Sequence, residues 1–185
     1  MRNILVALLM TLMLAGTAAA LEVAGVALEP TVTVNRHVLK LNGYGIRKKF
    51  FIKVYIGSLY AARHISSAAA ALNDNGDKLI RMNFLHSKVD KGKIIAAFKE
   101  GFQNNSPGLA GSAEVKRFLA LFTADFNRGD VVDLTLGADG TVAVSHNNRQ
   151  LGVVPSAQLA RSVLAIYLGS APADEDLKRG MLGKE

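Results

Sequence analysis

The spacing of apolar residues along the chain changes several times, and each change indicates a new element. Residues 31–41 (TVTVNRHVLKL) and 49–60 are rich in β-branched and aromatic side chains with partial alternation, which predicts two strands. The glycines of the intervening LNGYG predict a bend or bulge. The Ala-rich stretch 63–78 predicts a short helix or loop closed by an Asn-Asp-Asn-Gly turn, and 78–86 (KLIRMNFLH) predicts the next strand.

The spacing becomes helical after residue 86. Apolar residues recur every three or four positions in 87–106, which predicts a helix that Ser87 or Asp90 can cap, and again in 112–125. The residues on the apolar face of the first helix are Ile94, Ile95, Phe98 and Phe102.

The final third of the chain returns to alternation and then to helical spacing. Residues 130–154 predict strands joined by an Asp-Gly turn at 138–140 and a second turn at 146–150. Two helices are expected over 155–169 and 173–183, the latter capped by Asp174. The order of strands, two helices, strands and two helices indicates an α+β fold, an antiparallel sheet with helices packed on one face.

The first twenty residues have the layout of a secretory signal peptide. Arg2 precedes an apolar run from Ile4 to Leu14, and small residues follow up to Ala20. The alternative is a membrane anchor, but a spanning helix needs about 20 apolar residues. We predict cleavage near Ala20, a single domain over 21–185 with no further transmembrane span, and a periplasmic or secreted location.

Composition narrows the classes of function. The chain has no cysteine, which excludes disulfides, thiol catalysis and Cys-ligated iron–sulfur clusters. The formal net charge is +7, but no nucleic-acid-binding motif and no phosphate-binding glycine loop is present. The charge therefore favours an anionic membrane surface or an anionic ligand over nucleic acid, unless it is simply a solvated basic face.

The histidines do not form a metal site in the sequence. His37, His64, His86 and His146 include no pair at ligand spacing, so we expect no dedicated zinc site. His37, His64 and His146 are expected to be exposed. His86 ends a strand; it is either a surface or capping residue or, as an alternative, a haem ligand.

Two arginines are the strongest candidates for ligand binding. In the stretch GIRKKFFIKVYIGSLYAA (45–62), alternation places Lys53 and Tyr55 on one face, and we expect the opposite face with its Ile and Val residues to meet the helices. Arg47 lies near the glycine irregularity, and Arg81 is on the next strand. A half-buried arginine needs an anion, and a ligand carboxylate offers matching geometry. The alternative is an arginine stem on the sheet with its head group in water.

Three segments, 41–62, 81–105 and 159–183, resemble the chalcone isomerase-like family in its bacterial exported branch. The resemblance implies an open-faced β-sandwich, a large antiparallel sheet with helices layered against it. Catalytic members close a chalcone to a flavanone, and Arg47 matches their arginine. Their threonine position holds Tyr55 or Val54 here, and their active-site tyrosine has no counterpart in HSKVDKG (86–92).

Other members of that family bind fatty acids without catalysis, with arginine and tyrosine meeting the carboxylate. The resemblance therefore predicts a non-catalytic protein that binds an amphipathic anion in a sheet–helix cleft, through Arg47, Tyr55 and, more weakly, Arg81. No cofactor is expected. The alternatives are an intramolecular lyase using Arg47 and a haem- or tetrapyrrole-binding protein using His86.

Overall fold

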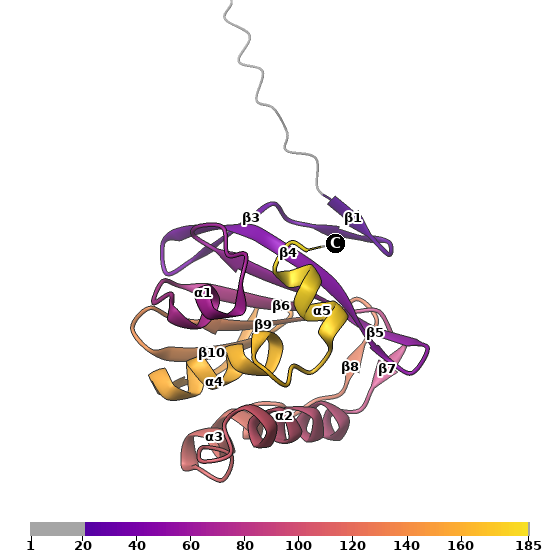
Figure 1. Ribbon diagram of the computed structural model, residues 1–185. Helices are drawn as coiled ribbons and strands as arrows, with labels where there is room; N and C mark the ends of the chain where they lie inside the picture. Colours follow the sequence, from indigo (N-terminus) through magenta and orange to yellow (C-terminus); the bar gives the residue numbers. More distant parts are fainter. Residues whose placement is uncertain (1–20, 185) are drawn as a thin grey trace, which may run out of the picture.

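A seven-stranded antiparallel sheet forms the centre of the structure, a computed structural model that describes residues 21–184 (Figure 1). The strand order across the sheet is β11-β10-β9-β6-β5-β4-β3. The strands are β3 (Thr31–Val34), β4 (His37–Lys49), β5 (Ile52–Ala61), β6 (Lys78–Phe84), β9 (Val131–Leu136), β10 (Thr141–His146) and β11 (Arg149–Pro155). Two small two-stranded sheets add β1 (Leu21–Val23) with β2 (Val26–Leu28), and β7 (Lys88–Val89) with β8 (Phe126–Asn127). The predicted signal peptide lies outside the described residues.

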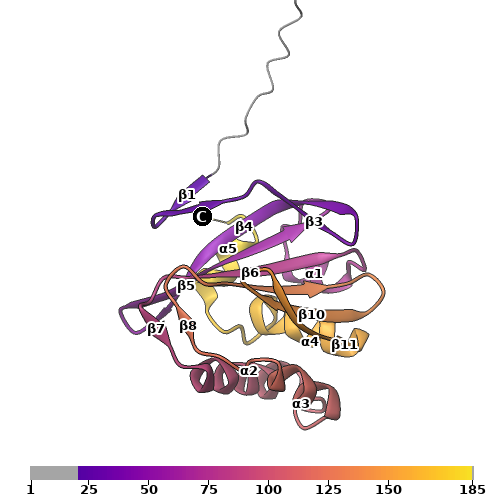
Figure 2. The same cartoon turned by 180° about the vertical axis from the view of Figure 1, so that it is seen from behind.

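The helices gather on one face of the sheet, which confirms the predicted α+β architecture (Figure 1). They are α1 (Ala68–Asn73), α2 (Lys91–Asn105), α3 (Ala113–Ala120), α4 (Ala157–Leu168) and α5 (Glu175–Met181). Seen from behind, β1 lies at the top of the molecule and α2 and α3 lie at the bottom (Figure 2). None of the helices within residues 21–184 is both long and apolar enough to cross a bilayer.

The large core lies between the sheet and the helices, and a small one lies on the far face. Alternation along the strands produces this division: in β10, Val142 and Val144 are fully buried among the helix-side residues. The far-face cluster consists of Val34, Leu39, Tyr60 and Leu79. The Tyr60 hydroxyl donates to the Glu29 carbonyl, 3.0 Å away, which ties the linker before β3 to this face.

Two turns fall inside segments that the sequence predicts as single strands. Asn35 and Arg36, both at positive φ, separate β3 from β4. Phe50 and Phe51 form a two-residue turn between β4 and β5, where Lys49 pairs with Ile52. The second turn was missed because it contains no Gly, Asn, Asp or Pro. The predicted bulge is confirmed, since the β4–β5 register shifts between Leu41 and Gly43.

The helix boundaries follow their capping residues. Asp90 accepts a hydrogen bond from the backbone N–H of Gly92 and Asp174 from that of Leu177, so both predicted caps are confirmed. The second predicted helix is shorter than expected, because α3 ends at Ala120. Of the two cap candidates Asp90 is the one used, and residues 88–89 before it form β7.

The prediction for the faces of β5 is wrong. Tyr55 and Leu59 belong to the core under the helices, and Gly57 between them lies against Leu177 of α5. Ile52 is largely exposed and Ile56 is absent from the helix-side cluster. Both faces of this strand are covered, so residue type alone does not distinguish them. Tyr55 therefore points into the space between the sheet and the helices.

Candidate functional site

Arg47 and Tyr55 form a pair across two neighbouring strands beneath the helical layer. They are opposite residues in the β4–β5 register, and the guanidinium carbon of Arg47 lies 6.0 Å from the centre of the Tyr55 ring. Arg47 is half-buried, whereas Tyr55 is only 3% exposed. At this distance the ring face attracts the cation, which fixes the side chain of Arg47 over the mouth of the cleft.

A narrow cleft extends from this pair between the sheet, α2 and α4. Its free volume is about 20 Å³, room for a single water molecule. The hydroxyl of Tyr167 on α4 donates to the Met82 sulfur of β6, 3.3 Å away. The lining residues are Arg47, Tyr55, Met82, Ile94, Ala97, Phe98, Ile166, Tyr167 and Ala173. The cleft thus has a cationic mouth, two phenol groups and otherwise apolar walls.

The charges of the cleft are fixed at neutral pH. Burial acts to lower the pKa of Arg47, but interactions with Tyr55, Tyr167 and Asp174 outweigh it and raise the pKa. Burial raises the pKa of Tyr55, which the Arg47 charge offsets only in part. Burial also holds the pKa of Tyr167 well above its ordinary value. The site therefore offers one permanent positive charge beside two neutral hydroxyl groups.

No carboxylate among residues 21–184 forms an ion pair with Arg47. The nearby Asp174 is committed to backbone groups, since its oxygens accept from the N–H of Leu177 at 3.0 Å and of Lys48 at 3.2 Å. Half-buried arginines are normally satisfied by bidentate anions. The arrangement can accept a carboxylate or a similar anion from outside the chain.

The structure does not bring Arg81 to this site. Arg81 lies on the far face of the sheet, where Nε and Nη2 donate to both oxygens of Asp133 at 2.7 and 2.8 Å. Its Nη1 also donates to Glu29 at 2.7 Å. A hollow of about 330 Å³ lies beside it, but two carboxylates already neutralise the guanidinium. Arg81 therefore serves to join β6, β9 and the N-terminal linker.

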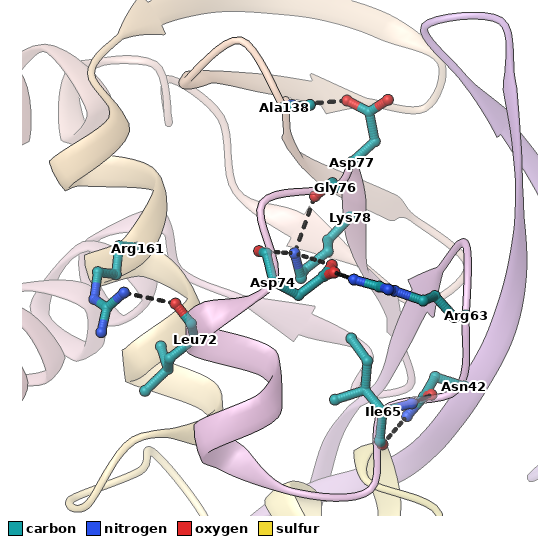
Figure 3. Close-up of polar contacts among 10 residues, drawn as sticks. All are labelled: Asn42, Arg63, Ile65, Leu72, Asp74, Gly76, Asp77, Lys78, Ala138 and Arg161. Carbon is teal, nitrogen blue, oxygen red and sulfur yellow. Dashed lines mark hydrogen bonds and ion pairs between the residues drawn. The ribbon is translucent and has the colours of Figure 1, made fainter.

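A larger hollow, of about 540 Å³, lies between α1, α4 and the β9–β10 turn, and its buried cation is also satisfied (Figure 3). Lys78 is 3% exposed and donates to the carbonyls of Asp74 and Gly76 at 2.6 and 2.9 Å, while its ammonium lies 2.8 Å from the Asp74 carboxylate. Arg161 donates to the Leu72 carbonyl at 2.6 Å. These contacts lock the loop before β6 and leave no buried cation for a ligand, whereas Arg161 is exposed to water.

Replacing Lys78 with methionine should lower the free energy of unfolding by about 2–3 kcal/mol. The change leaves two carbonyls and the carboxylate of Asp74 without their buried donor, although Arg63 still pairs with Asp74. Urea titration followed by circular dichroism measures the effect. The exposed Lys116 of α3, replaced by methionine, is the control and should change stability by less than about 0.5 kcal/mol. Equal stability of both variants would contradict a structural role for Lys78.

The histidines occupy different parts of the fold. His37 and His64 are exposed, as predicted, and His37 lies 2.6 Å from the Asp77 carboxylate. The prediction for His146 is wrong, because it belongs to β10 and packs on Phe126 with a ring separation of 5.2 Å. His86 is half-buried after β6, and its backbone N–H donates to the Val54 carbonyl at 3.3 Å. Within residues 21–184, no group of three or more potential metal-ligating His, Asp or Glu side chains gathers.

Sequence reasoning missed the half of the site that the helices contribute. Tyr167 comes from α4 and Phe98 from α2, 112 and 43 residues after Tyr55 by their numbers in the chain. The available signal was the phenol of Tyr167 on the largely apolar face of the 155–169 helix. The partner of the Tyr167 hydroxyl on β6 is the Met82 sulfur, which is only a weak acceptor. A tyrosine and a methionine so far apart in the chain do not form a motif that the sequence reveals.

The fold and the cleft together define a class of proteins with an antiparallel sheet, a helical layer and an arginine–tyrosine pair between them. The chain belongs to the chalcone isomerase-like family, whose model matches residues 20–183. It is 27% identical over 108 residues to Fatty-acid-binding protein 1 of Arabidopsis thaliana, covering 56% of this chain and 39% of that protein. The chain thus spans well under half the length of this relative.

A solved structure shows the same fold. The crystal structure of an Arabidopsis thaliana fatty-acid binding protein superposes with a TM-score of 0.66 and 22% sequence identity. The match covers 85% of this chain and 92% of that one. This confirms the predicted chalcone isomerase-type fold.

Proposed function

We propose that this protein binds a long-chain fatty acid, or a closely similar amphipathic anion, without transforming it. The observation that carries the proposal is the half-buried Arg47, which stands at the mouth of an apolar cleft without a carboxylate partner in the described chain. Its guanidinium would hold the carboxylate in bidentate fashion, and Tyr55 would donate a hydrogen bond. The relatives that are fatty-acid-binding proteins support this choice of ligand.

The acyl chain would lie among the aromatic side chains beyond Tyr55. The rings of Tyr55 and Phe84 are 5.6 Å apart, and those of Phe84 and Phe126 are stacked at 4.7 Å. Phe98 and Phe122 continue this cluster toward α2 and α3. Burying a methylene group in such surroundings contributes about 0.8 kcal/mol, so affinity should rise with chain length.

Entry of the ligand requires the cleft to open. A ligand pocket typically has about 300–1,000 Å³, far more than the 20 Å³ present. The element suited to move is α2, which packs on α4 rather than directly on the large sheet (Figure 1). Gly101 of α2 lies against the Ile166 side chain, and separation at this contact would admit the acyl chain.

A comparison of two ligands that differ only in the head group tests the proposal. Titration calorimetry of the delipidated protein should show palmitate binding at least about 30-fold more tightly than hexadecanol, because only palmitate offers a charge to Arg47. Native mass spectrometry of the protein from its own host should show a fatty acid bound. Equal affinity for the acid and the alcohol, or binding of neither, would refute the proposal.

The affinity for palmitate should stay constant from pH 7 to about pH 10. An ordinary tyrosine is half ionised near pH 10, and a phenolate would repel the bound carboxylate. Because the pKa values of Tyr55 and Tyr167 are raised, the neutral form of both predominates in the native protein through this range. The stability that these two raised pKa values contribute is present below pH 10 and is lost as the pH rises above 10, where unfolded tyrosines ionise. Calorimetric titrations at pH 7, 8.5 and 10 measure the affinity, and a loss at pH 8.5 would contradict neutral phenols.

We further propose that the protein is exported through residues 1–20 and belongs to the bacterial exported branch of the family. The charged start, apolar run and small residues before Leu21 support this location. Mass spectrometry of the protein from the periplasmic fraction should give an N-terminus near Leu21. Retention of residues 1–20 would favour the membrane anchor instead.

Intramolecular lyase activity is the second candidate function. The observation in its favour is that Arg47 and the two neutral phenols could stabilise the phenolate of a chalcone. Chalcone absorbance should then decay faster with the protein than with its Arg47→Ala variant. No acceleration over buffer on any chalcone would remove this candidate and leave fatty-acid binding unaffected.

A further inference from the structure

The tip of the β4–β5 hairpin carries an apolar and basic surface, which we call the hairpin tip and define as residues Lys48 to Lys53. Phe51 is 100% exposed, Phe50 85% and Ile52 49%, whereas large apolar residues elsewhere in the described chain are mostly buried. Lys48, Lys49 and Lys53 surround them and are also exposed. Figure 1 shows the hairpin extending from the body of the molecule beside the end of β7.

The residues at the turn are poor choices for a turn in water. A two-residue hairpin turn normally uses Asn-Gly, Asp-Gly or Gly-Gly, which accept positive φ. Here Phe50 adopts a φ of +56°, a conformation that is unfavourable for a bulky side chain. Strain of this kind is found where a binding surface requires it. Exposure of two aromatic rings to water is unfavourable, and this cost is removed only when an apolar surface covers them.

We propose that the hairpin tip inserts into the surface of an anionic lipid bilayer. The three lysines match the negative charge of such a surface, and the Lys49 ammonium is 5.9 Å from the Phe50 ring, so charge and ring project together. Asp174 accepts only from the backbone N–H of Lys48, and no ion pair within residues 21–184 involves the ammonium group of Lys48, Lys49 or Lys53. Interfacial membrane anchors place aromatic rings below the lipid head groups and basic side chains at the level of the phosphates. The phenylalanines and lysines of the hairpin tip match this arrangement.

The hairpin tip lies next to the mouth of the cleft, and its suggested role in ligand transfer rests on the proposed function. Arg47 directly precedes the tip on β4, and Tyr55 lies two residues after Lys53 on β5. The neighbouring residues Leu85 and His86, which lead into β7, both donate to the Val54 carbonyl. A bilayer that covers the tip would therefore face the cationic mouth, and a fatty acid could pass between membrane and cleft with little exposure to water.

A tryptophan at the tip gives a local measurement, because the chain contains no natural tryptophan. The full-length Phe51→Trp variant is mixed with vesicles of phosphatidylglycerol and phosphatidylcholine (1:1), and with vesicles of phosphatidylcholine alone. The emission should shift to shorter wavelength only with the anionic vesicles. In the control, Val38→Trp at the opposite end of β4, where Val38 is 60% exposed, emission should not shift. Insertion of the apolar residues 1–20 alone would not move the signal at position 51.

Substitutions separate charge from apolar insertion. Changing the three lysines to glutamine in the Phe51→Trp protein should reduce vesicle partitioning about 100-fold, since each basic residue near the surface contributes about fivefold and the three factors multiply. Phe50→Ser with Phe51→Ser should reduce binding measured by vesicle flotation at least about tenfold. Both variants should keep their affinity for palmitate in solution, which shows that they remain folded.

Three outcomes would overturn the inference. These are an unshifted emission with anionic vesicles, an equal shift at position 38, and formation of a dimer through the hairpin tip in the absence of lipid, as measured by light scattering. Failure of the proposed function looks different: the vesicle shift would persist in a protein that binds no palmitate.

Discussion

Replacing Arg47 with alanine should reduce the affinity for palmitate by about 30- to 4,000-fold and leave the affinity for hexadecanol almost unchanged. Loss of one partner of a buried, hydrogen-bonded charge pair costs about 2–5 kcal/mol, and tenfold in affinity corresponds to about 1.4 kcal/mol. The other cations beside the hollows of the described chain lie elsewhere: Lys78 and Arg81 are paired with carboxylates, and Arg161 is exposed and donates to the Leu72 carbonyl. No second charge can replace Arg47 at the cleft.

Two further variants make the result specific. Arg149→Ala removes an exposed arginine from β11, at the opposite edge of the sheet, and should leave both affinities unchanged. Arg47→Lys keeps the charge but loses the bidentate geometry, so its affinity for palmitate should be intermediate. If Arg47→Ala binds palmitate as tightly as the unchanged protein, the carboxylate does not lie at Arg47.

The alternation of apolar residues predicted the architecture because most strands have one face in the large core. In β9 every second residue is buried, and this pattern is visible without the structure. The β4–β5 hairpin was not predicted as such, because Phe50 and Phe51 continue an apolar stretch and give no turn signal. The sequence feature that hid the turn is the same one that suggests a membrane-facing role.

The candidate site was predictable only in part. Arg47 and Tyr55 came from the resemblance of one continuous segment, and the structure brings them together across a strand pair. Tyr167 and Met82 meet only after α4 has packed on β6, a contact between residues 85 positions apart. The nearly closed state of the cleft depends on side-chain packing between α2 and α4, which local patterns do not report.

The glycines of LNGYG have a function that the prediction of a bulge does not cover. A Cβ atom at Gly43 would collide with the Gly180 carbonyl oxygen and lie 2.8 Å from both the Gly183 nitrogen and the Met181 oxygen. These are backbone atoms of α5 and its C-terminal end, which cannot move aside as a flexible side chain can. The helix therefore rests directly on the backbone of β4 (Figure 1).

Gly43→Ala should consequently lower the free energy of unfolding by at least about 3 kcal/mol, the upper part of the range for overpacking. Urea titration measures the loss, and Gly111→Ala, where an added Cβ meets nothing within 4 Å, should be nearly neutral. A displaced α5 would also release Asp174 from the N–H of Lys48, next to Arg47, so the affinity for palmitate should fall together with stability. If Gly43→Ala is as stable as Gly111→Ala, the close approach of α5 to β4 is not required by the fold.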